Sequence, residues 1–242
     1  MKVDVLGVPF DNTTRKDALR QLLNFLTEDH NHLLITPNPE IVMEAQEDEE
    51  LMKILNEAEL VVPDGIGVVL ASKFEKNSIK ERVPGCDLMF DLFEVMKDME
   101  KSVYILGGAP GVAEKAKRRM GEKYRNLNII GVHHGYFNEQ EEEKIINEIK
   151  QLKPDLLMVG LGCPRQEKWI YKNKHKLPVK VSAGIGGTID IMAGTAKRAP
   201  IIFQKMGLEW LHRLLAQPTR IRRIIKLPLF LLTVLKNKIN RK

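Results

Sequence analysis

The first 195 residues alternate between short apolar runs and longer amphipathic segments. The runs have the length of buried strands, and the amphipathic segments have the spacing of helices with one apolar face. The expected strands are Val3–Leu6, Leu33–Thr36, Leu60–Val62, Val103–Leu106, Asn128–Val132, Leu156–Val159 and Val179–Ala183. The expected helices are Thr14–Leu26, Glu49–Ala58, Asp87–Met99, Val112–Tyr124, Glu139–Gln151 and Arg165–Asn173. This alternation predicts an α/β fold with a mostly parallel, Rossmann-like sheet covered by helices.

Glycine, proline and small polar residues directly follow five of the expected strands. The five segments are Thr36–Glu40, Pro63–Gly67, Gly107–Gly111, Gly160–Glu167 and Gly184–Thr188. Parallel strands end on the same edge of a sheet, and open α/β sheets bind their ligands there. We therefore expect these segments to form one large ligand surface.

The length and cysteine content favour an intracellular α/β protein. A chain of 242 residues can bury a sizeable core, and its two cysteines, Cys86 and Cys163, lie far apart in the sequence. They provide neither a disulfide framework nor zinc-ligand spacing. An acid at Asp4 interrupts the position where a signal peptide would build its apolar run. These features predict a protein of the cytoplasm.

Charge divides the chain into two parts. Residues 196–242 hold twelve bases and the single acid Glu209, whereas residues 1–195 hold 26 bases and 31 acids. Within the basic part, an amphipathic stretch over 201–217 precedes an apolar run over 227–235 that is too short to span a bilayer and contains Pro228. Such a segment is typical of helices that lie on an anionic membrane surface. We predict an α/β domain over 1–195 and a helical membrane-binding appendage over 196–242.

Two other interpretations of the basic segment remain. A C-terminal helix packed on the core, with its lysines in water, would have the same pattern. Nucleic acid binding is disfavoured, because stacking aromatic residues are scarce in the segment and its leucine and isoleucine content is high. Its apolar surface could also be buried in a homo-oligomer away from the membrane.

Several polar residues of the strand-end segments suit sugar-phosphate chemistry. Asp64 could act as a general base or could cap the helix that follows it. Arg82 could hold a phosphate in bidentate fashion or lie on the surface. Gly107 and Gly108 could admit a phosphate at a helix N-terminus or only form a tight turn. Thr36 and Asn38 could bind sugar hydroxyls or serve the turn alone.

The sequence offers no obvious metal site. It has no Asp-x-Asp triplet, His133 and His134 are adjacent, and the six histidines form no evident cluster. Glu167 beside Gln166 is read here only as favourable to the dipole of its helix. We predict that no metal or other cofactor is required, and that arginines stabilise a departing diphosphate.

Taken together and in order, these segments resemble the WecG/TagA/CpsF family of bacterial glycosyltransferases. The matching segments are Thr36–Glu40, Pro63–Gly67, Arg82–Gly85, Leu106–Gly108, Gly160–Glu167, Ala183–Pro200 and Gly207–Leu214. The resemblance covers almost the whole chain. It implies an inverting, metal-independent transfer of N-acetylmannosamine from its UDP donor to undecaprenyl-diphosphate-linked N-acetylglucosamine. The product would enter wall teichoic acid linkage-unit synthesis, with the enzyme peripheral on the inner face of the cell membrane.

The resemblance also assigns residues, with 1–195 as the catalytic domain. It implies that Asp64 is the catalytic base. Residues expected to line the donor and acceptor sites are Thr36, Asn38, Arg82, Gly107, Gly108, Gly162, Gln166, Gly184 and Gly186. Basic residues expected to reach the donor diphosphate from the appendage are Arg213, Arg220 and Arg223. Family members differ in donor, so another UDP-sugar such as N-acetylmannosaminuronic acid remains an alternative.

Two rival functions belong to other classes. A nicotinamide-dependent oxidoreductase would suit the fold, but no G-x-G-x-x-G motif with a downstream acid follows the first strand. A peripheral membrane adaptor that senses a nucleotide sugar would share the basic segment and need no catalytic base. Substitution of Asp64 separates this adaptor from a transferase.

Overall fold

The computed structural model, which describes residues 1–75, 77–216 and 226–240, contains a parallel sheet of six strands. The strand order is β4-β3-β8-β7-β5-β6, and every neighbouring pair runs parallel. The strands are β3 (His32–Ile35), β4 (Leu60–Val61), β5 (Ser102–Gly107), β6 (Asn128–His133), β7 (Leu156–Gly160) and β8 (Val181–Gly184). The α/β class and the parallel sheet predicted from the sequence are confirmed.

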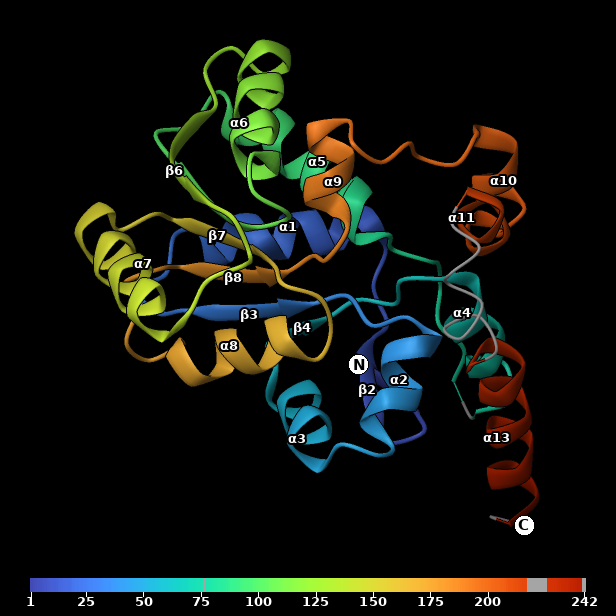
Figure 1. The fold of residues 1–242 in the computed structure, drawn as a ribbon. Helices are drawn as coiled ribbons and strands as arrows, with labels where there is room; N and C mark the ends of the chain where they lie inside the picture. Colours follow the sequence, from blue (N-terminus) through green and yellow to red (C-terminus); the bar gives the residue numbers. More distant parts are fainter. Residues whose placement is uncertain (76, 217–225, 241–242) are drawn as a thin grey trace.

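Helices cover both faces of this sheet (Figure 1). One face carries α1 (Arg15–Phe25), α5 (Gly85–Met96), α6 (Val112–Lys123) and α9 (Thr188–Ala193), and the other carries α3 (Glu49–Glu57), α7 (Glu139–Leu152) and α8 (Arg165–Asn173). Successive strand residues alternate between the two apolar clusters: Ile105 packs with the first set and Leu106 with the second. Burial on both faces explains why the strands have continuous apolar runs rather than alternation.

The N-terminal strand does not join this sheet. β1 (Lys2–Val5) pairs antiparallel with β2 (Val8–Asp11) in a separate hairpin. The two residues between them, Leu6 and Gly7, have φ values of 55° and 83°, as a two-residue hairpin turn requires. The sequence reading placed a strand at Val3–Leu6 but missed β2, because Leu6 is not a residue that normally signals such a turn.

Helix starts follow their capping residues. Thr14 Oγ1 accepts a hydrogen bond from Asp17 N at 3.2 Å, which confirms the predicted start of α1. Asn138 and Glu141 form a reciprocal capping box at the start of α7.

The remaining helices lie at the edge where β3 and β4 end. They are α2 (Pro39–Ala45), α4 (Ile66–Ser72), α10 (Ile201–Lys205), α11 (Glu209–Ala216) and α13 (Lys226–Asn240). The last helix packs against α2 and α4 (Figure 1). Phe230 and Val234 of α13 are buried in the same apolar cluster as the sheet. One face of the C-terminal helix is therefore part of the core.

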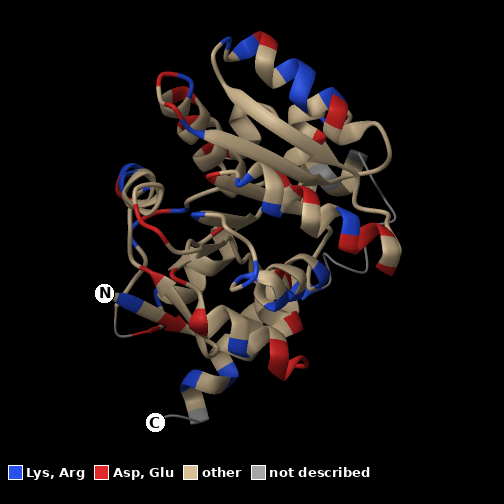
Figure 2. Ribbon diagram, turned by 90° about the vertical axis from the view of Figure 1, so that its left-hand side faces the viewer, with Lys and Arg blue, Asp and Glu red and all other residues tan. Residues whose placement is uncertain are grey.

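The outward face of α13 is apolar as well. Leu232 is 63% exposed and Ile239 is 73% exposed, and Leu229 and Leu235 lie on the same exposed stripe. Figure 2 shows basic but no acidic residues on this helix, which ends at the C-terminus. Within the described residues, no helix combines the length and apolar character needed to cross a bilayer. Binding of this face to a membrane, and the domain boundary after residue 195, stay predictions.

Candidate active site

Three chain segments meet where β3 and β4 end, and backbone hydrogen bonds connect them. Asp64 N donates to Pro37 O at 3.1 Å, and Val83 N donates to Pro63 O at 2.9 Å. The segment after β3, the segment after β4 and the segment before α5 therefore form one rigid unit. The prediction that parallel strand ends bring these residues together is confirmed at this part of the edge.

Asp64 points its carboxylate at the beginning of α5. Its Oδ2 accepts a hydrogen bond at 3.3 Å from the N–H of Gly85, the first residue of that helix. The N-cap of the following helix α4 is Gly65, which has a φ of 104° and no side-chain cap. The interpretation of Asp64 as the cap of that helix is therefore wrong. The half-buried carboxylate sits instead where the positive end of α5 favours a negative charge.

Thr36 shares this position with Asp64. A Cβ atom added to Gly85 would lie 2.9 Å from Thr36 Cγ2 and 3.0 Å from Thr36 Oγ1. The hydroxyl of Thr36 and the carboxylate of Asp64 thus both lie against the first residue of α5. The close approach requires glycine at position 85, because any side chain there would displace Thr36.

Asn38 has the structural role that its turn position allowed. Its Oδ1 accepts a hydrogen bond from Ile41 N at 3.0 Å and caps α2, whose first residue is Pro39. A Cβ on Gly65 would lie 3.7 Å from Asn38 Cβ, so Asn38 borders the segment that carries Asp64. The expected contact of Asn38 with a substrate sugar stays a prediction.

Arg82 is not a free surface arginine. Its guanidinium forms an ion pair with Glu209 of α11 and donates to Gln204 O of α10 at 3.5 Å, with only 16% of the side chain exposed. Arg198 pairs with Asp87 of α5, and its Nε lies 3.8 Å from Glu209 Oε1. Glu209 and Arg198 thus hold the basic C-terminal segment against Arg82 and α5.

The glycines at the ends of β5 and β7 are required by close packing. A Cβ on Gly107 would lie 2.4 Å from Gly160 O, and a Cβ on Gly108 would lie 2.8 Å from Val112 Cγ1. Both have positive φ, at 147° and 73°. Gly111, the N-cap of α6, has nothing within 4 Å of its added Cβ. The tight-turn alternative accounts for Gly107 and Gly108, and Gly111 leaves the N-terminus of α6 open.

Gln166 connects the loops that follow β7 and β8. Its Oε1 accepts hydrogen bonds from Gly162 N at 3.2 Å and from Gly186 N at 3.1 Å, and its Nε2 donates to Glu167 Oε1 at 2.8 Å. A Cβ on Gly184 would lie 3.4 Å from Gln166 Nε2. Gln166 is 3% exposed, so it supports the loops of this sheet edge from the interior of the protein.

Glu167 is a fully buried acid, which the sequence did not predict. It was expected only to favour the helix dipole, but it is 0% exposed and its Oε2 has no hydrogen-bond partner. Burial raises the pKa of its carboxyl group. The helical spacing of its neighbours could have predicted this burial. The buried stripe of α8 beside Glu167 consists of Gln166, Trp169, Ile170 and Asn173.

One group of potential metal ligands lies together among the described residues, and it is not at this edge. It consists of Glu28, His30 and His32, near the opposite ends of the strands. The expectation that the histidines do not cluster is wrong for this pair. The expectation that the reaction requires no metal is a separate matter and stays a prediction.

An acid on a rim of glycine-rich strand ends, next to basic residues, suits a sugar-phosphate ligand. The model of the protein family described as "Glycosyl transferase WecG/TagA/CpsF family" matches residues 3–242. The chain belongs to this family. Its relatives include the N-acetylglucosaminyldiphosphoundecaprenol N-acetyl-beta-D-mannosaminyltransferases of Staphylococcus aureus strains MRSA252 and NCTC 8325 / PS 47. Each is 36% identical over 239 residues, which cover 98% of this chain and 93% of the relative.

Membership of the WecG/TagA/CpsF family makes the protein a glycosyltransferase rather than an oxidoreductase or a binding adaptor. The appendage arginines are only partly covered by the structure. Arg213 lies on α11 but its side chain is outside the described residues, as are Arg220 and Arg223 altogether. Their contact with a diphosphate stays a prediction.

Two residues that contact the candidate site were not predicted from the sequence. Glu209 and Arg198 form the link between α11, Arg82 and α5. The sequence contained a signal for Glu209, because it is the only acid in residues 196–242. A lone carboxylate among twelve bases indicates a specific partner more strongly than it indicates solvent exposure.

Proposed function

We propose that the protein transfers N-acetylmannosamine from UDP-N-acetylmannosamine to undecaprenyl-diphosphate-linked N-acetylglucosamine, with inversion at the anomeric carbon and without a metal. The printed names of the Staphylococcus aureus relatives describe this acceptor and this sugar. The observation that carries the proposal is the half-buried carboxylate of Asp64, held by Gly85 N beside Thr36.

In the proposed reaction, the acceptor hydroxyl approaches the anomeric carbon from the side opposite UDP. Asp64 removes the proton of that hydroxyl as the new glycosidic bond forms and the bond to the diphosphate breaks. The hydrogen bond from Gly85 N fixes the direction of the carboxylate, so little reorganisation is needed during the step. Thr36 and Asn38 border the acceptor and donor sugars.

The leaving diphosphate needs positive charge. Arg82 is the arginine of the hydrogen-bonded segments that carry Asp64, and Arg213, Arg220 and Arg223 complete the set of candidates. Arg82 pairs with Glu209, so we propose that the diphosphate replaces this carboxylate as the partner of Arg82 when the donor binds. Movement of α11 would then accompany donor binding.

The donor lies along the glycine-rich strand ends in this proposal. The loops after β3, β8, β7 and β5 follow one another along the edge, and three strand intervals of about 4.8 Å give a surface roughly 14 Å wide. The loops of Gly162 and Gly186 are fixed by Gln166, and the N-terminus of α6 at Gly111 is open. An extended nucleotide sugar suits such a rim.

The acceptor places the reaction at the inner surface of the cell membrane. The exposed leucines and the lysines of α13 support peripheral binding to an anionic bilayer, next to the edge that holds Asp64. The same apolar stripe could pair with a second copy of the chain away from the membrane. In this account the product enters wall teichoic acid synthesis.

A transfer assay with a lipid-diphosphate N-acetylglucosamine analogue tests the proposal. UDP-N-acetylmannosamine should give a disaccharide product whose rate is unchanged by a chelator, and product NMR should show the inverted anomeric configuration. UDP-N-acetylmannosaminuronic acid and UDP-N-acetylglucosamine are the comparison donors. Faster transfer from either of them would overturn the donor assignment, and loss of product with chelator would overturn the metal-independent mechanism.

A further inference from the structure

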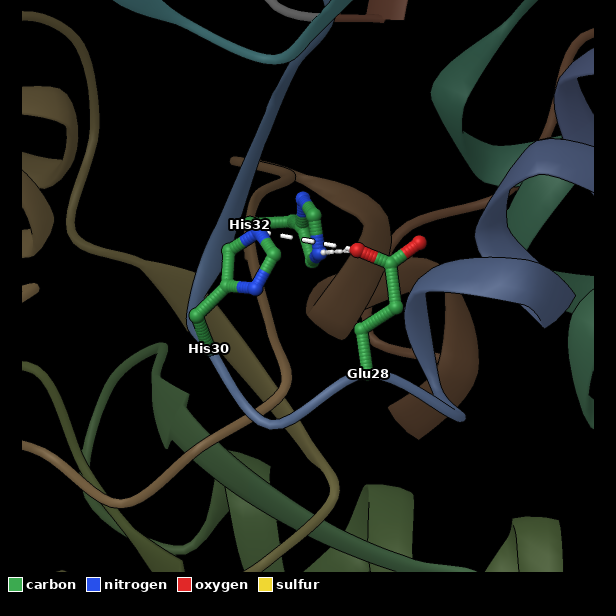
Figure 3. Close-up of side chains that lie close together, drawn as sticks. All are labelled: Glu28, His30 and His32. Atoms are coloured by element: carbon green, nitrogen blue, oxygen red, sulfur yellow. Dashed lines mark ion pairs between the residues drawn. The ribbon is translucent and has the colours of Figure 1, made fainter.

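A second group of polar side chains lies at the opposite edge of the sheet, where the strands begin. His32 is the first residue of β3, and Glu28 and His30 belong to the turn between α1 and β3. Figure 3 shows the side chains of both histidines directed toward the carboxylate of Glu28. The reaction proposed above uses none of these residues.

Their ligand atoms are spaced as in a metal centre. Glu28 Oε2 lies 3.0 Å from His32 Nε2 and 3.6 Å from His30 Nε2, and one ligand atom from each residue falls within 4.8 Å of the others. A tetrahedral zinc ion with bonds of about 2.0–2.1 Å places its ligand atoms roughly 3.3–3.4 Å apart. The distances from Glu28 Oε2 to the two histidine nitrogens lie on either side of this value, so small side-chain shifts would complete the tetrahedral geometry.

The buried state of His32 supports a metal centre independently of the ligand spacing. Its side chain is only 4% exposed, yet neither ring nitrogen has a hydrogen-bond partner of acceptable geometry, even though Nε2 is close to Glu28. Buried polar nitrogens normally have a partner. The ring is held in place by stacking on Phe25, with centroids 3.8 Å apart and planes 6° from parallel. A fixed imidazole with an unpartnered nitrogen suits a metal ligand.

We propose that Glu28, His30 and His32 bind a zinc ion. Two imidazoles and one carboxylate form a donor set that zinc uses in proteins, with a fourth position left for water. His30 also lines a hollow of about 460 Å³ beside the cluster, which gives that water room. The ion would tie the end of α1 to the start of β3. It would be separated from Thr36 by the length of β3, about 13 Å.

Titration calorimetry on untagged, chelator-dialysed protein tests this site with zinc chloride alone. We expect saturable binding of one ion per chain. The Glu28→Gln and His30→Ala variants should each bind zinc at least about 100-fold more weakly, because even loss of an outer-shell partner costs about 10- to 100-fold. Both altered side chains are more than two-fifths exposed, so the fold should be retained.

His175→Ala is the matched control, because His175 is an exposed histidine that lines the same hollow outside the cluster. It should bind zinc as the unaltered protein does. Zinc should also raise Tm in the unaltered protein and the control but not in the two cluster variants, whereas magnesium or calcium should change none of them. Absence of saturable binding, or equal loss in His175→Ala, would show that the cluster is only an ion pair.

Discussion

Gly85 contacts both Asp64 and Thr36 at the start of α5. Its N–H holds Asp64, and the absence of a side chain gives Thr36 its place. Position 85 therefore links two candidate functional residues through a single backbone unit at the start of α5. Sequence alone did not reveal this, since a glycine after Val83-Pro84 is equally explained by an ordinary turn.

Gly85→Ala should lower kcat by roughly 10- to 100-fold, because the new methyl group displaces Thr36 and shifts Asp64 from its position. Steady-state transfer assays measure the effect. Gly121→Ala is the matched control: it lies on α6 with open space around its added Cβ and should leave kcat unchanged. Equal kcat values for the two variants would show that the glycine at position 85 is not needed for catalysis.

Glu167 predicts a pH dependence of stability. Burial raises its pKa above that of the unfolded chain, so the folded state holds this proton more tightly. The stability that this raised pKa contributes is fully present below the pKa of Glu167 in the unfolded chain. It is lost as the pH rises through the pKa of Glu167 in the folded protein. Glu167→Gln should therefore gain stability relative to the unaltered protein as the pH rises.

Chemical denaturation across about pH 5 to 9 would measure this difference. The exposed Glu143→Gln variant on α7 is the control and should follow the unaltered protein at every pH. A Glu167→Gln curve parallel to that of the unaltered protein would contradict a raised pKa at this position.

At the scale of elements, α13 belongs to the core on one face and faces outward on the other. Phe230 is 0% exposed against α2 and α4, whereas Leu232 is 63% exposed. The sequence predicted a helix-forming, apolar and basic segment here, and offered packing and membrane binding as alternatives. The structure confirms packing for one face, and a single helix can serve both roles.

Phe230→Ala should destabilise the protein by about 3–5 kcal/mol, the usual cost of removing a buried phenylalanine side chain. Leu232→Ala should change stability by less than about 0.5 kcal/mol, because that side chain is exposed. Urea unfolding followed at Trp169, a buried residue of α8 that packs in the apolar cluster of the sheet, measures both. Similar midpoints for the two variants would mean that α13 unfolds independently of the sheet.

Elements with strong local signals were predictable, and those set by tertiary contacts were not. The expected range Arg165–Asn173 coincides with α8, and Thr14 marks the start of α1. The short helix α2 was missed because its seven residues are fewer than the window of about 11 residues in which helical periodicity can be recognised. The ion pair of Arg82 with Glu209 joins positions 127 residues apart, a distance that no local pattern encodes.

At the scale of the molecule, the helices α4, α10, α11 and α13 lie together toward one end of the sheet (Figure 1). In the proposed function, one orientation of this end on a bilayer would bring the acceptor diphosphate to Asp64. The Glu28, His30 and His32 cluster lies at the other edge. The proposed catalytic and metal sites are therefore structurally separate.

Leu232→Asn should weaken binding to vesicles containing phosphatidylglycerol by about 10- to 150-fold, since burial of one leucine contributes about 1.5–3 kcal/mol. Co-sedimentation measures the partition. The matched control is Leu152→Asn on α7, whose leucine is 39% exposed. Unchanged binding by Leu232→Asn would remove α13 from the membrane contact.

The central claim is that Asp64 removes the acceptor proton, and turnover of Asp64→Asn measures it most directly. The variant keeps the shape of the side chain but cannot accept the proton. We predict a fall in kcat of roughly 10²- to 10⁴-fold with donor affinity retained, while Asp98→Asn, an exposed position beyond α5, keeps full turnover. Near-normal turnover by Asp64→Asn would contradict the account.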